Sequence, residues 1–126
     1  MHKTLDTKYV YYELQDDLLI GTYKKNPRLN LEMVKDIVKV RLEFTGPEPV
    51  VGLVYNQGVV SMDKKARDYL ASEEGVRGFK AAAIILDSPF SSFLVNFFVS
   101  VTKPKIPVKM FSKKEAALKW LQQFRK

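Results

Sequence analysis

Hydrophobic and polar residues follow one another along this chain in a pattern that predicts short strands alternating with helices. Two β-rich runs, residues 9–14 and 18–23, are separated by a short polar turn, which indicates a hairpin. Residues 50–55 are a continuous apolar run, typical of a strand that is buried on both faces, and residues 79–86, which are apolar except for Lys80, predict another buried strand. A last short strand is expected over residues 107–111. These runs predict a sheet of five strands.

The segments between these strands have the spacing of amphipathic helices. A first helix is expected to begin after Asn30, a typical N-cap residue, and to end at Gly46. Its expected inward positions are Leu31, Val34, Val38 and Leu42. A second helix is expected over residues 63–71. Its expected inward positions are Met62, Ala66, Tyr69 and Leu70.

Two further helices are expected in the last third of the chain. The third follows Ser88 and Pro89, which suit a cap and a first helical position, and it ends at Pro104. The fourth begins at a capping box, in which Ser112 is followed three residues later by Glu115. Its expected inward side chains are Ala117, Trp120, Leu121 and Phe124.

The order of these elements is ββαβαβαβα, which predicts an α/β fold with a mostly parallel five-stranded sheet, about four helices and an antiparallel first strand. A chain of 126 residues is long enough for one hydrophobic core, so residues 1–126 are expected to form a single domain. The apolar runs are too short to span a bilayer and the first residues contain no apolar signal core. A cytoplasmic location is therefore expected.

Several kinds of chemistry find no support in the sequence. The chain has no cysteine, which excludes disulfides, thiolate metal sites and cysteine nucleophiles, and its single histidine is His2. It also has no glycine-rich phosphate loop and no Gly-x-Ser-x-Gly motif. We therefore expect a non-enzymatic protein without cofactor or metal. The alternative is a carboxylate-based activity at the ends of the parallel strands, near Asn56, Gln57 and Asp87.

Positive charge is concentrated at the end of the chain. The net charge is +7, yet residues 1–102 hold 13 basic and 13 acidic side chains, whereas residues 103–126 hold eight basic side chains and one acidic one, Glu115. One interpretation is a solvated lysine surface that maintains solubility. The other is a contact surface for an acidic partner or for an anionic membrane, reached peripherally. Nucleic acid is the least favoured partner, because arginine clusters and a row of stacking aromatics are missing.

Four residues around the start of the second helix are candidates for a regulatory site: Ser61, Asp63, Lys64 and Lys65. Ser61 or Asp63 can cap the helix by accepting a hydrogen bond from a first-turn N–H group, a purely structural role. In the functional interpretation, the Ser61 hydroxyl lies at the positive end of the helix. A phosphate on it would be held by backbone amides and by the nearby Lys64 and Lys65.

The element order, the serine near the second helix and the ending PKIPVKMFSKKEAALKWL together resemble the STAS-like proteins. The resemblance covers residues 9–124. Within the STAS-like proteins, the chain resembles more specifically a group of small uncharacterised bacterial proteins with the fold of the sporulation anti-sigma-factor antagonist. This resemblance implies a regulatory domain for protein–protein recognition. In the antagonists a partner kinase phosphorylates a serine in an Asp-Ser-x-Gly segment, and Ser61 is the matching position. Val60 precedes Ser61 here and the glycine is absent, which argues against an intact switch.

The expected third helix has no charged residue on either face. Its apolar stripe, from Phe90 to Val101, accounts for a core-facing side. The opposite side consists of small neutral residues, among them the interface candidates Ser91, Ser92, Val95, Asn96 and Val99. Interface cores are similarly depleted of charge. Three interpretations of this neutral side remain open: it is covered by other parts of the domain, it forms the contact surface of a homodimer, or it contacts a foreign partner. The same helix is also the basis of an alternative function, the binding of a small molecule or a lipid.

A change of Val95→Glu tests the homodimer. If the neutral side joins two copies, light scattering during gel filtration gives a dimer mass for the native chain and a monomer mass for the variant, because a buried charge opposes association. A native chain that elutes as a monomer contradicts the homodimer.

Overall fold

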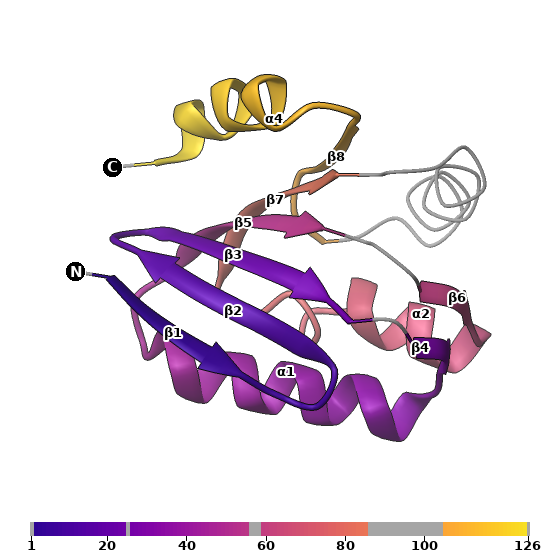
Figure 1. Cartoon of the computed structure of the whole chain (residues 1–126). Helices are drawn as coiled ribbons and strands as arrows, with labels where there is room; N and C mark the ends of the chain where they lie inside the picture. The colour runs from indigo at the N-terminus through magenta and orange to yellow at the C-terminus, as the bar shows by residue number, and fades with distance from the viewer. Residues whose placement is uncertain (1, 25, 56–58, 86–104, 126) are drawn as a thin grey trace.

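The computed structural model describes residues 2–24, 26–55, 59–85 and 105–125. Its main sheet has, within these residues, six strands in the order β1-β2-β3-β5-β7-β8 (Figure 1). Their bounds are β1 His2–Asp6, β2 Val10–Gln15, β3 Leu18–Tyr23, β5 Val50–Tyr55, β7 Phe79–Ile85 and β8 Val108–Phe111. A separate pair of parallel strands is formed by β4 Asn26–Leu29 and β6 Val59–Met62.

The pairing of the strands confirms the predicted α/β fold. β2 is antiparallel to β3, whereas β3, β5, β7 and β8 run parallel to one another. The predicted count of five strands is one too low, because β1 adds an antiparallel strand at the edge next to β2. Four of its five residues are exposed, so β1 is held mainly by backbone pairing and has no hydrophobic pattern to reveal it.

Helices cover both faces of the main sheet (Figure 1). α1 Leu31–Thr45 and α2 Lys64–Ala71 lie on one face, and α4 Lys114–Leu121 lies on the other, followed by the 3-10 turn Gln122–Phe124. Each face has its own cluster of buried apolar residues. The predicted third helix falls within residues 86–104, outside the described residues. No helix in the described part of the chain has the length and apolar character needed to cross a bilayer.

The ends of α1 agree with the local sequence signals. The Asn30 side chain accepts a hydrogen bond from Met33 N at 2.9 Å, the expected N-cap geometry. Gly46 ends the helix with φ 78°, a left-handed conformation that glycine adopts without strain, and its N–H donates to Leu42 O. The fully buried side differs slightly from the prediction, since Leu31 and Leu42 are only half-buried. The buried residues are Val34, Ile37, Val38 and Arg41.

The predicted capping box of the last helix is wrong. The N-cap residue is Lys113, and its side chain makes no capping hydrogen bond. Ser112 therefore lies one position before the cap. Of the four predicted inward side chains, Ala117 and Leu121 are buried. Trp120 and Phe124 are half-buried, and together with Phe111 they form an aromatic cluster with ring centroids 5.0–5.8 Å apart.

Leu121 has no exposed surface and belongs to the apolar cluster between α4 and the sheet. We expect Leu121→Ala to lower the free energy of unfolding by about 2–5 kcal/mol, because it removes buried apolar surface and leaves a cavity. Leu118→Ala is the matched control, and its smaller loss reflects the half-buried position of Leu118. Urea unfolding measures both, and equal losses would contradict the described packing of α4.

Candidate functional site

The carboxyl ends of the parallel strands β3, β5 and β7 lie on the same side of the sheet, and β4, β6 and the start of α2 lie beyond these strand ends (Figure 1). Ligands and partners of parallel α/β sheets commonly bind at the carboxyl ends of the strands. All four predicted regulatory residues fall within β6 and the start of α2. We call the surface formed by β4, β6 and the first turn of α2 the recognition rim.

Ser61 does not lie at the start of the helix, so this part of the prediction is wrong. Its backbone belongs to β6, where its Cα pairs with that of Arg28 in β4. This pairing extends the strand to Met62, and α2 begins only at Lys64. The pairing joins segments that are far apart in the sequence, which is why the local pattern around Ser61 could not predict it.

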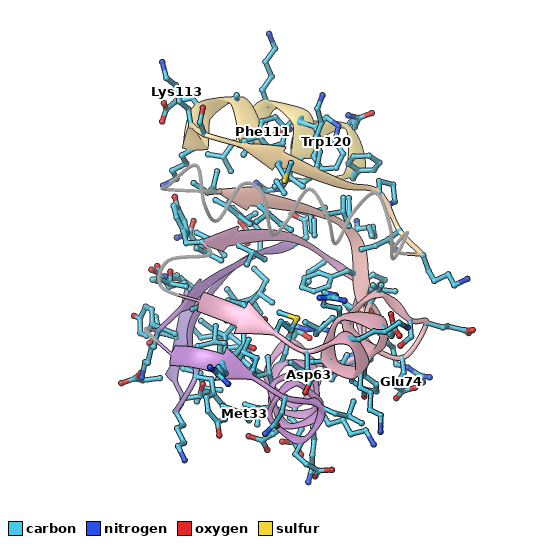
Figure 2. The ribbon with its side chains drawn as sticks, turned by 90° about the vertical axis from the view of Figure 1, so that its right-hand side faces the viewer. Met33, Asp63, Glu74, Phe111, Lys113 and Trp120 are labelled. Atoms are coloured by element: carbon cyan, nitrogen blue, oxygen red, sulfur yellow. The ribbon has the colours of Figure 1, made fainter. Side chains whose placement is uncertain are left out.

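Asp63 occupies the N-cap of α2 and confirms the capping alternative (Figure 2). Its carboxylate accepts a hydrogen bond from Ala66 N at 2.8 Å, and its backbone oxygen accepts one from Arg67 N at 3.0 Å. The chain itself therefore supplies the negative charge that the helix start favours. A phosphate at the same helix end would be repelled by the Asp63 carboxylate.

The two lysines that follow are exposed. Lys64 Nζ lies 2.8 Å from Asp68 Oδ2, four residues further along α2. Exposed pairs of this kind contribute little to stability, so the ion pair does not fix the lysine. Arg28 on the neighbouring strand β4 is also exposed.

Other predicted residues lie outside the described part of the chain. The five interface candidates, Ser91, Ser92, Val95, Asn96 and Val99, fall within residues 86–104. Asn56, Gln57 and Asp87, named for a carboxylate-based activity, also fall in undescribed segments. His2 Nε2 lies 3.5 Å from Glu13 Oε2 in the β1–β2 pair. The described residues contain no group of three or more His, Cys, Asp or Glu side chains that could hold a metal ion.

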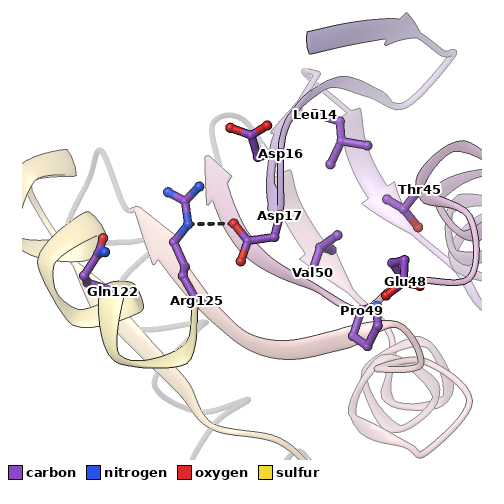
Figure 3. Close-up of a pocket in the computed structure, with 9 residues that line it drawn as sticks. All are labelled: Leu14, Asp16, Asp17, Thr45, Glu48, Pro49, Val50, Gln122 and Arg125. Carbon is purple, nitrogen blue, oxygen red and sulfur yellow. Dashed lines mark hydrogen bonds and ion pairs between the residues drawn. The ribbon is translucent and has the colours of Figure 1, made fainter. Parts of the chain in front are cut away.

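The basic segment at the end of the chain is only partly a solvated surface. Lys105, Lys109, Lys113, Lys114 and Lys119 are exposed. Arg125 instead donates from Nε to Asp17 Oδ1 at 2.8 Å (Figure 3). Lys80 Nζ lies 3.9 Å from the other carboxylate oxygen of Asp17. The ion pair of Arg125 with Asp17 lies in an open pocket of about 610 Å³ at the amino end of β5.

Arg41 is a buried charge that the sequence analysis did not identify. Its side chain is only 4% exposed and lies over the Phe79 ring, 4.1 Å from the ring centroid. It donates to Gly75 O at 3.0 Å and to Arg77 O at 2.8 Å. Its position could have been inferred from helical spacing, since Val34, Val38 and Arg41 continue one stripe of α1.

Burial also changes the titration of the groups around Arg41. Desolvation lowers the pKa of Arg41 and raises the pKa values of Tyr12 and Tyr23. Both tyrosines therefore remain neutral hydroxyls at physiological pH, able to donate a hydrogen bond.

Comparisons with known proteins identify the family and the fold. Residues 12–125 match the family described as "Domain of unknown function (DUF7793)". Among solved structures, the chain is similar to an uncharacterised protein of the DUF3478 family from Shewanella loihica PV-4, described as having a SpoIIAA-like fold. The TM-score is 0.60 at 19% identity, over 96% of this chain and 95% of the other. The predicted STAS-like fold is thereby confirmed. The comparison with curated proteins found no match.

The capping role of Asp63 can be tested with two substitutions. We expect Asp63→Ala to destabilise the protein by about 0.5–2 kcal/mol, because an N–H group in the first turn of α2 loses its acceptor. Asp63→Asn retains an acceptor oxygen and should stay close to the native stability. Urea unfolding gives the stabilities, and amide hydrogen exchange shows whether the loss is greatest in α2. Equal losses for the two variants would contradict the capping role.

Proposed function

The chain belongs to the family described as "Domain of unknown function (DUF7793)", and we propose that it is a non-enzymatic regulatory domain that recognises an acidic segment of another protein. The proposed contact surface is the recognition rim, with Ser61, Asp63, Lys64 and Lys65. A cytoplasmic location and a homodimer belong to the same proposal, and both rest on the sequence alone.

The observation that carries this proposal is the separate pair β4–β6. The pair consists of two strands of four residues, so each strand has one side without a strand neighbour in the described part of the chain. The backbone N–H and C=O groups of such a side can pair with an extended segment of another protein. Strand addition of this kind gives affinity through the backbone, and the surrounding side chains then provide specificity.

The charges around β4–β6 support an acidic partner. Arg28, Lys64 and Lys65 are exposed on the recognition rim, and complementary charge increases the rate and specificity of association. Asp63 already satisfies the start of α2. An acidic segment would therefore be recognised by the basic side chains and not by the helix dipole.

Ser61 is the regulatory position in this proposal. A phosphoserine adds about −1.5 to −2 charge at pH 7. At Ser61 that charge would be placed on β6, directly across from the Cα of Arg28 in β4. It would oppose the approach of an acidic segment, so phosphorylation would weaken binding.

A photo-crosslinking residue at position 65 tests the recognition rim in cells of the source organism. We expect a covalent adduct with one protein, identified by mass spectrometry. Its yield should fall at least tenfold with Lys64→Glu, because the reversed charge repels an acidic segment.

The same crosslinker at position 113 is the matched control. Lys113 is exposed and is the N-cap residue of α4. It lies far from Asp63, as Figure 2 shows. An adduct with the same protein from both positions would indicate non-specific attraction to lysines and would contradict the proposal. The absence of an adduct from position 65, or a yield that Lys64→Glu leaves unchanged, would also contradict it.

A further inference from the structure

A small cavity lies between the sheet and the helices α1 and α2, with a volume of about 140 Å³. We call it the Arg41 cavity. Its walls are almost entirely apolar, and they come from the strands β2, β3, β5, β7 and β8, the helices α1 and α2, and the segments before β7 and β8. Representative wall residues are Val10, Leu19, Ile37, Val54, Ala82 and Ile84.

Arg41 is the one ionised side chain among the residues that line this cavity. Buried charges in proteins are normally paired with an opposite charge. Arg41 instead donates to two backbone carbonyls, of Gly75 and Arg77, and forms no ion pair with a carboxylate of the described residues. A guanidinium has five N–H donors, so Arg41 retains capacity for a further acceptor.

Tyr23 provides a second donor in the cavity wall. It lines the cavity, and its hydroxyl has no hydrogen-bond partner among the described residues. It is close enough to Arg41 for each group to influence the titration of the other. The neighbouring Tyr12 hydroxyl donates to Ile37 O over a long 3.4 Å. A guanidinium and a neutral hydroxyl together suit the two oxygens of a carboxylate.

We propose that the Arg41 cavity binds a small apolar carboxylate whose body is about the size of one benzene ring, with its carboxylate on Arg41 and Tyr23. The size follows from the volume, because an apolar protein cavity of about 150 Å³ accommodates benzene. The charge follows from Arg41, whose positive charge is balanced by no described carboxylate. This site is separate from the recognition rim, and its existence does not depend on the proposed function.

Benzoate is the probe for this proposal. In a titration followed by calorimetry and by NMR, we expect one site with a Kd of about 0.1–1 mM, since small ligands gain limited free energy per atom. The NMR shifts should be largest at Arg41, Tyr23 and Ala82. Benzyl alcohol, which has the same ring but no charge, should bind at least tenfold more weakly.

Two variants separate loss of the site from loss of the fold. Ala82→Leu adds apolar atoms inside the cavity and leaves Arg41 in place, so the protein should fold and benzoate binding should be lost. Ala116→Leu makes the same change at an exposed position of α4 and should leave binding unchanged. Arg41→Lys keeps the charge but not the fork of donors, and it should weaken benzoate binding more than benzyl alcohol binding.

Three outcomes would overturn the proposal. The first is the absence of saturable benzoate binding up to about ten times the expected Kd. The second is equal binding of benzoate and benzyl alcohol, which would show an apolar cavity without recognition of the carboxylate. The third is unchanged binding to folded Ala82→Leu, which would place the bound benzoate elsewhere on this basic protein.

Discussion

The turn between α2 and β7 depends on one buried side chain. Arg41, projecting from α1, holds the carbonyl oxygens of Gly75 and Arg77 and lies over the ring of Phe79, where β7 begins. Hydrogen bonds to a charged group contribute about 1.5–3 kcal/mol each, a large share of the roughly 5–15 kcal/mol by which a domain is stable. Gly75 itself has no room for a side chain, because an added Cβ would overlap the Tyr69 backbone oxygen. The guanidinium thus links α1 to the turn that follows α2 and to the start of β7.

The features that the sequence predicts well are those encoded by neighbouring residues. Asn30 and Gly46 bound α1 through contacts within four residues, and the runs that became β5 and β7 are apolar apart from Lys80. The features that it does not predict depend on distant partners. β1 is held by pairing with β2 and has no apolar face, and Ser61 is drawn into a strand by β4, more than thirty residues earlier.

The same distinction applies to the candidate sites. Asp63 could be identified as a cap because its acceptor role is local. Helical spacing places Arg41 on the buried stripe of α1, but its partners could not be inferred, since Gly75 and Arg77 are over thirty residues away in the turn that closes over it. Arg125 shows the same effect: in the sequence it is one of eight basic residues, whereas in the structure it pairs with Asp17, 108 residues earlier.

The order of strands across the main sheet also bears on how the protein is made. Each strand from β1 to β8 joins the sheet beside its predecessor in that sheet, and none is inserted between two earlier ones. During synthesis on the ribosome, which proceeds from the N-terminus, the sheet can therefore grow outward from one side without reopening a formed pair. At each stage one open edge waits for the next segment, and such edges are prone to pair with other chains. Growth ends at β8, a short strand carrying the exposed Lys109, so the nascent protein is most vulnerable to aggregation before this last strand emerges.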